Sequence, residues 1–149
     1  MYIPGYVYGT VYDNFYSCLM NKPLHGMIKI EFNAELDILE VSFKGDIRLN
    51  DMLEYGEMIK KNVTLPRNLK ILTDATKANY QFSPTEIREM MKALKEQIKP
   101  YLSVKTAVIQ NKPVETALSM LVDDTDRIIG YDHKVFSSRE AALNWLLKS

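Results

Sequence analysis

One hydroxyl group, that of Ser83, stands where the sequence predicts the beginning of a helix. The residues Ser83-Pro84-Thr85-Glu86 spell a capping box with proline at the first helical position. A phosphoryl group on Ser83 would place negative charge at the positive end of the helix dipole, which is favourable, although Glu86 would oppose it. Capping alone explains the serine, because its side chain can accept a hydrogen bond from the Glu86 N–H. We therefore favour a structural role for Ser83 over a phosphorylation switch.

Two further polar side chains, Asp74 and Thr76, lie at the end of a buried-type strand predicted at 69–74. Ligands of open α/β sheets bind at the carboxyl ends of the strands, so this pair is a candidate for binding. A carboxylate and a hydroxyl in a loop also satisfy nearby backbone N–H groups. We favour that second interpretation.

Aromatic and methionine side chains surround the same region. Tyr80 and Phe82 fall in the polar loop expected after the strand, where an exposed aromatic pair would mark a surface for a partner. Met52, Met90 and Met91 fall on the helices predicted before and after it. Because methionine adapts its shape, these residues can line an apolar pocket, although methionine more often simply fills a core.

The other candidates for metal or catalytic chemistry have ordinary explanations. Asp123, Asp124 and Asp126 lack the glycine-kinked loop of a calcium site, so we expect them to end a helix in solvent. No phosphate-binding glycine loop, nucleophile elbow or HExxH motif occurs. The only histidines and the only cysteine have no motif partner: His25, His133 and Cys18. The sequence therefore predicts no catalytic residue, no metal and no cofactor, and we expect a protein that is not an enzyme.

Composition bounds the class of protein. The chain has 149 residues, of which 46% are hydrophobic and 26% charged, as in soluble globular domains. The 19 basic residues balance 19 acidic ones, so nothing favours a nucleic-acid partner. No apolar run approaches the roughly 18 residues of a membrane span. A single cysteine and the lack of a signal-peptide pattern predict a cytoplasmic location.

Residues 1–26 differ from the rest of the chain. They hold five of the nine tyrosines and almost no charge. Regular patterning begins at Met27, which could even be the true start of translation. We therefore divide the chain into a Tyr-rich N-terminal extension, 1–26, and one domain, 27–149.

The patterning of that domain alternates strands with helices. Period-2 segments at 28–32 and 38–43 predict an antiparallel hairpin, which Gly45 and Asp46 end. Helical spacing of apolar residues predicts three helices, at about 50–62, 84–98 and 114–122. In the first of these, Gly56 would allow the helix to lie close against the sheet. Strands are expected at 69–74, 104–109 and 134–136, and a last helix with a capping box formed by Ser137 and Glu140.

This order predicts an α/β fold with a mixed sheet. Strands that alternate with helices pair mainly in parallel through right-handed crossovers. The opening hairpin adds one antiparallel pair. About four helices are then expected to pack on the sheet.

The order of elements resembles the STAS family, the fold of bacterial anti-sigma-factor antagonists, and in particular its SpoIIAA-like branch, also called STAS/SEC14-type. The resemblance covers residues 27–149 and depends on the hairpin, on the string ILTDAT at a strand end, and on the C-terminal string HKVFSSREAALNWL. In antagonists of this family an Asp-Ser-Ser-Gly motif opens a helix, and a partner kinase phosphorylates its first serine. That position falls on Ser83, but Phe82, Pro84 and Thr85 replace the other motif residues.

The resemblance implies a non-enzymatic regulatory or protein-interaction domain that lacks an intact phosphoacceptor motif. We expect a protein partner to bind at the start of the second helix, through Asp74, Thr76, Tyr80, Phe82 and Ser83. The alternative, implied by the SEC14-type label, is an apolar small molecule or lipid bound between the sheet and the helices that carry the three methionines. A homodimer fits either hypothesis.

Overall fold

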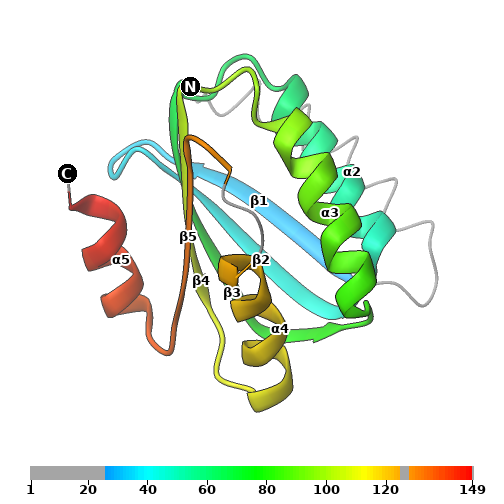
Figure 1. Cartoon of the computed structure of the whole chain (residues 1–149). Helices are drawn as coiled ribbons and strands as arrows, with labels where there is room; N and C mark the ends of the chain where they lie inside the picture. Colours follow the sequence, from blue (N-terminus) through cyan, green and yellow to red (C-terminus); the bar gives the residue numbers. More distant parts are fainter. Residues whose placement is uncertain (1–25, 125–127, 149) are drawn as a thin grey trace.

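Five strands form one mixed sheet in the computed structural model of the protein, in the order β1-β2-β3-β4-β5 (Figure 1). The structure describes residues 26–124 and 128–148. β1 and β2 are antiparallel, and all the other neighbouring strands are parallel. The predicted α/β sheet with a single antiparallel hairpin is thereby confirmed. The strands are β1 (Met27–Asn33), β2 (Ile38–Ile47), β3 (Asn68–Tyr80), β4 (Ser103–Ile109) and β5 (Tyr131–Phe136).

Helices cover both faces of the sheet. α2 (Leu49–Lys61) and α3 (Pro84–Gln97) lie side by side on one face, and α5 (Arg139–Leu147) lies on the other (Figure 1). α4 (Pro113–Asp124) contacts β5, α3 and β3, on the same side as α2 and α3. Within residues 26–124 and 128–148, these four helices agree with the number expected for the domain from the sequence.

The core has two parts because the central strands are covered on both faces. Along β3, Ile71 belongs to the larger cluster under α2 and α3, whereas its neighbour Leu72 belongs to the smaller cluster under α5. Successive side chains of a strand point to opposite faces, so a strand buried on both sides is apolar at consecutive positions. The consecutive apolar residues Ile71 and Leu72 in the sequence therefore reflect burial on both faces of the sheet.

The hairpin and the central strand are both longer than predicted. β2 continues through Gly45 and Asp46 to Ile47, and β3 continues six residues past Asp74 to Tyr80. The loop expected between Asp74 and Ser83 is therefore mostly strand, and that prediction was wrong. The extensions pair with each other, from Lys44↔Lys77 to Ile47↔Tyr80, which propensities for single strands cannot reveal.

On the edge of β3 that faces away from β2, side chains take the place of a neighbouring strand beyond Asp74. β4 ends opposite Asp74, and beyond that point no strand of the described residues pairs with β3 on that side. The buried Gln110 amide donates to the Ala75 carbonyl oxygen at 2.6 Å, and the Lys112 ammonium donates to the Ala78 carbonyl oxygen at 2.9 Å. The extended end of β3 is thus held by β2 on one side and by two side chains on the other.

A β-bulge divides β3 at Ala75 and Thr76. The register passes from Ser42↔Asp74 to Lys44↔Lys77, so β3 has one residue more than β2 in this interval. An extra residue reverses which alternate side chains face each side of the sheet. Thr73 before the bulge and Tyr80 after it consequently face the same side, although one number is odd and the other even.

The ends of the helices match the sequence in one case and differ in another. The Ser83 Oγ accepts a hydrogen bond from the Glu86 N–H at 3.2 Å, and a Glu86 carboxylate oxygen accepts one from the Ser83 N–H at 2.9 Å, so this capping box is confirmed. The capping box expected at Ser137 was wrong. α5 begins one residue later, and Ser138 caps it by accepting a hydrogen bond from the Ala141 N–H. The last strand is also longer than expected and begins at Tyr131.

Gly56 permits a close contact between two helices, and not between a helix and the sheet as the sequence suggested. A Cβ atom at this position would overlap the side-chain amide of Gln97 on α3. That amide is buried and donates to the Leu53 carbonyl oxygen of α2 at 3.3 Å. The glycine therefore sets the distance between α2 and α3.

We expect Gly56→Ala to destabilise the protein by about 1 kcal/mol, as measured by urea unfolding. Overpacking costs about 1–3 kcal/mol, which outweighs the gain of roughly 1 kcal/mol in helix propensity. In a Gln97→Ala background the amide is absent, and the same change should stabilise the protein. Stabilisation in both backgrounds would contradict a close contact between the two helices.

Candidate functional site

An apolar cavity of about 120 Å³ lies between the sheet and the three helices on its larger-core face. Its walls come from four strands and from α2, α3 and α4. Met52 of α2 and Met90 and Met91 of α3 are among its lining residues. The cavity lies where the sequence hypothesis of an apolar ligand placed it.

Tyr80 and Phe82 form part of the cavity wall. Their rings stack with centroids 5.0 Å apart and planes inclined at 22°, and both pack against the larger core cluster. Both side chains are half-buried. The pair therefore lines an internal space as well as meeting solvent, whereas the sequence suggested a pair on a contact surface.

Two threonines bring hydroxyl groups to the cavity floor. Thr73 of β3 and Thr106 of β4 line the cavity, and their residues are only 3% and 8% exposed. Within the described parts of the chain, neither hydroxyl is hydrogen-bonded to a protein group, and neither oxygen belongs to the fully buried polar atoms that lack a partner. Both hydroxyls are therefore open to the space of the cavity, and a few polar groups in a mostly apolar lining are typical of a ligand site.

The other polar groups of the cavity are uncharged or weakly basic. The Ser119 hydroxyl of α4 donates to the Tyr80 hydroxyl at 3.4 Å. Burial raises the pKa of Tyr80, an effect that hydrogen bonds from Ser119 and Gln110 partly reduce, so the phenol is neutral at physiological pH. His133 of β5 also lines the cavity, next to Thr106 in the sheet register. No Asp, Glu, Lys or Arg is among the described residues that line it.

Tyr55, on the α2 wall, makes the stability of the protein sensitive to alkali. Its ring meets Phe43 edge-on with centroids 5.8 Å apart. Burial raises the pKa of Tyr55 far above its ordinary value of 10.0, and the nearby Tyr131 and Tyr101 raise it further. The folded protein therefore keeps a proton that the unfolded chain releases above about pH 10.

Because the folded-state pKa is the higher one, the stabilisation is complete below pH 10 and is lost as pH rises above it. We expect the free energy of unfolding to fall by about 1.4 kcal/mol per pH unit for each such tyrosine. Urea unfolding at a series of pH values measures the slope. Tyr55→Phe should remove the contribution of one proton, about 1.4 kcal/mol per pH unit, from the slope of unfolding free energy against pH. An unchanged slope would contradict the burial of this phenol.

A second prediction concerns the threonines. Thr73→Val and Thr106→Val each keep the shape of the side chain and remove a hydroxyl that faces the mostly apolar cavity without a protein hydrogen bond, so each should stabilise the ligand-free protein by about 1 kcal/mol in urea unfolding. Thr64→Val is the matched control, because the exposed Thr64 hydroxyl donates to Asn62 at 2.6 Å and its loss should not stabilise. Destabilisation by both cavity variants would show that these hydroxyls are satisfied.

The other residues of the predicted partner surface do not join this site. Asp74 and Thr76 lie at the bulge, where an Asp74 carboxylate oxygen accepts hydrogen bonds from the Thr76 N–H at 3.0 Å and hydroxyl at 2.7 Å. Tyr80 lies six residues after Asp74 in the strand, which is roughly 20 Å along β3. Ser83 is exposed at the start of α3. The structure groups Tyr80, Phe82 and Ser83, and places Asp74 and Thr76 apart from them.

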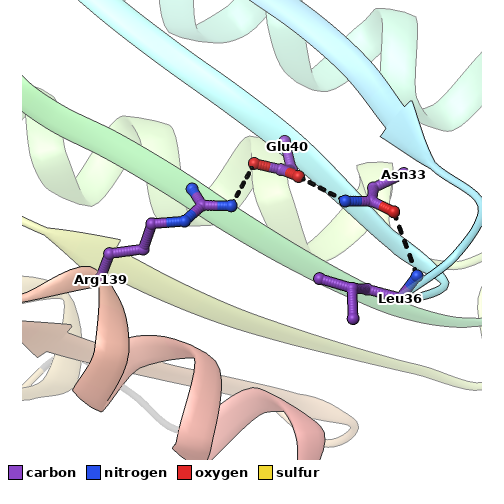
Figure 2. Close-up of polar contacts among 4 residues, drawn as sticks. All are labelled: Asn33, Leu36, Glu40 and Arg139. Carbon is purple, nitrogen blue, oxygen red and sulfur yellow. Dashed lines mark hydrogen bonds and ion pairs between the residues drawn. The ribbon is translucent and has the colours of Figure 1, made fainter.

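Asp74 instead lines a polar hollow of about 240 Å³ on the opposite face of the sheet. Beside it, Arg139 of α5 reaches Glu40 of β2 at 2.8 Å, and the same carboxylate accepts a hydrogen bond from Asn33 (Figure 2). Three cationic and three acidic side chains line the hollow: Lys29, Lys44, Arg139, Glu31, Glu40 and Asp74. The balance of charge gives this face no preference for a ligand of either sign.

Several residues considered in the sequence lie outside the described structure. Cys18, His25 and Asp126 are among them, as is the Tyr-rich segment before Gly26. Asp123 and Asp124 belong to the last turn of α4, but their side chains are not described. In the part of the chain that is described, no three His, Cys, Asp or Glu side chains gather as metal ligands would, and no helix has the length and apolar character to cross a membrane.

Sequence reasoning missed Thr73, Thr106 and Ser119 as cavity residues. The two threonines sit at inward positions of strands that are otherwise apolar, in ILT and VKTAVI. A polar residue at an intended core position is an anomaly that can mark function. That signal was available, but the pairing of β3 with β4, which brings the two threonines together, was not.

Comparison with known proteins supports the fold. No family model matches the chain, and no curated protein matches it. A solved structure does match, that of an uncharacterised protein from the DUF3478 family with a SpoIIAA-like fold, from Shewanella loihica PV-4. The TM-score is 0.53 at 18% sequence identity, and the match covers 82% of this chain and 94% of that one. The protein therefore has a SpoIIAA-like fold, as the resemblance of its sequence implied.

Proposed function

We propose that the protein is a non-enzymatic binding domain that holds a small apolar molecule in the cavity between the sheet and α2, α3 and α4. The single observation that carries this proposal is the cavity itself, with its apolar lining and few polar groups. Ligand sites in proteins have this composition. The single cysteine of the sequence further favours action in a reducing compartment such as the cytoplasm.

The cavity volume bounds the size of the ligand. An engineered apolar cavity of about 150 Å³ binds benzene. The cavity here is about 120 Å³, so its occupant would be one ring or a short chain. The long acyl chains of membrane lipids would need the cavity to open further. The methionines of the lining are flexible enough to adapt to ligands of somewhat different shape.

The lining also favours binding over catalysis. General acid–base chemistry needs a side chain that exchanges a proton near neutral pH. His133 is the only histidine among the described lining residues, and no Asp, Glu or Lys is among them. This scarcity of residues that commonly act as acids or bases supports a binding role.

The partner surface predicted from the sequence is adjacent to this cavity. Phe82 lines the cavity, and the next residue, Ser83, is exposed at the first turn of α3. A ligand that displaces the Tyr80–Phe82 pair would therefore alter a solvent-facing helix end. We propose this helix end as the surface where a protein partner would sense occupancy. Phosphorylation of Ser83 is disfavoured by Glu86, which already bonds to its backbone.

Methionine methyl NMR on the full chain tests the proposal, with toluene as the probe. Toluene should shift the ¹³C-methyl signals of Met52, Met90 and Met91 in a saturable manner, because these three residues line the cavity. Met120 is the internal control, since its residue is 52% exposed on α4. Equal shifts at Met120, or no shift at the three lining methionines, would contradict the proposal.

A cavity-filling variant extends the test to the natural ligand. Ser119→Leu adds apolar volume inside the cavity, whereas the control Ala117→Leu adds it to an exposed position of the same helix. We expect a compound in the solvent extract of wild-type and Ala117→Leu protein purified from its own cells, analysed by gas chromatography–mass spectrometry, and none from Ser119→Leu. The same compound in all three extracts would place it outside the cavity.

A further inference from the structure

We infer that Thr73 and Thr106 bind the polar group of the ligand, which is therefore a neutral molecule with one hydroxyl or carbonyl group on a small apolar body. This inference rests on the proposed function and deepens it by naming the class of ligand. Its basis is the juxtaposition, in one mostly apolar cavity, of two hydroxyl groups that are open to the space of the cavity.

The positions of the two threonines suit recognition of one ligand group. Thr106 pairs with Ile71 in the sheet, and Thr73 lies two residues further along β3 on the same face. The spacing of neighbouring strands and the rise per residue place their Cα atoms roughly 8 Å apart. A ligand hydroxyl between them can donate to one threonine and accept from the other. A carbonyl can accept from either.

The accessibility of the two hydroxyls also favours a ligand role. The two residues are more than nine-tenths buried, and within residues 26–124 and 128–148 neither hydroxyl has a hydrogen bond. Neither oxygen belongs to the fully buried polar atoms that lack a partner, so each is open to the space of the cavity. A ligand in the cavity can therefore form a hydrogen bond with either hydroxyl, which a valine at the same position could not offer.

The lack of Asp, Glu, Lys and Arg among the described lining residues disfavours ligands that carry a charge. A carboxylate or phosphate would lose its hydration inside the cavity without Lys or Arg to replace it, since neither occurs among the described lining residues. An ammonium group would likewise find no Asp or Glu. At pH 8 the cavity is therefore expected to select uncharged molecules.

Three probes of nearly equal size separate the contributions of apolar contact, hydrogen bonding and charge to binding at pH 8. They are toluene, benzyl alcohol and benzoate. The methyl signals of Met52, Met90 and Met91 report binding of each probe to the full chain. Wild-type protein should bind toluene and benzyl alcohol but not benzoate. In the double variant Thr73→Val with Thr106→Val, benzyl alcohol should weaken about tenfold relative to toluene, as loss of one neutral hydrogen bond allows.

Two further variants control for changes of shape. Thr64→Val alters a threonine remote from the cavity lining and should leave the affinity ratio of the two probes unchanged. Thr73→Ser with Thr106→Ser keeps both hydroxyls and should keep the preference for benzyl alcohol, even where toluene affinity changes. Thermal melting of every variant confirms that the proteins compared are folded.

Each remaining outcome overturns a different statement. An affinity ratio that is the same in wild type and in the valine variant would mean that the threonines do not recognise the polar group, and that water alone satisfies them. Benzoate bound more tightly than benzyl alcohol would overturn the neutrality of the ligand. If neither toluene nor benzyl alcohol moved the cavity methionines, the proposed binding function itself would fail together with this inference.

Discussion

The arrangement of this molecule depends on the pairing of β2 with β3 past a single extra residue in β3. Before the bulge, alternate residues of β3 face the larger core at odd positions; after it, they do so at even positions. Tyr80 is consequently directed to the same side as Thr73. If the same sequence paired without the bulge, the register from Ser42↔Asp74 would place Asn79 opposite Ile47, on that side. One register shift therefore decides whether an aromatic or an amide side chain closes that side of the cavity.

The cavity is a gap in packing that a small molecule can fill. Protein interiors are close-packed, with few voids larger than a water molecule. A volume of about 120 Å³ between the sheet and three helices departs from that rule. Its lining offers apolar contacts, and the hydroxyls of Thr73 and Thr106 can orient a polar group. Occupation of this space by a small molecule is the function that we propose for it.

The fold by itself does not decide the function. A SpoIIAA-like arrangement of strands and helices is a scaffold, and the chemistry belongs to the sites on it. At the start of α3, Ser83 and Glu86 form a complete reciprocal cap, so both side chains already have a structural role. The cavity has polar groups for which the described structure offers no such role. The geometry therefore favours the cavity over the start of α3 as the candidate functional site.

The sequence alone determined the class of fold, the order of the elements and the cap at Ser83, because these depend on local periodicity and on contacts three or four residues apart. It also indicated an apolar pocket near Met52, Met90 and Met91. Only the tertiary structure decided that β3 continues to Tyr80, that Gly56 meets Gln97, and that Thr73 and Thr106 share one cavity. Each of these features depends on pairing between segments distant in the chain, and register between such segments is a property of the folded sheet that no single segment encodes.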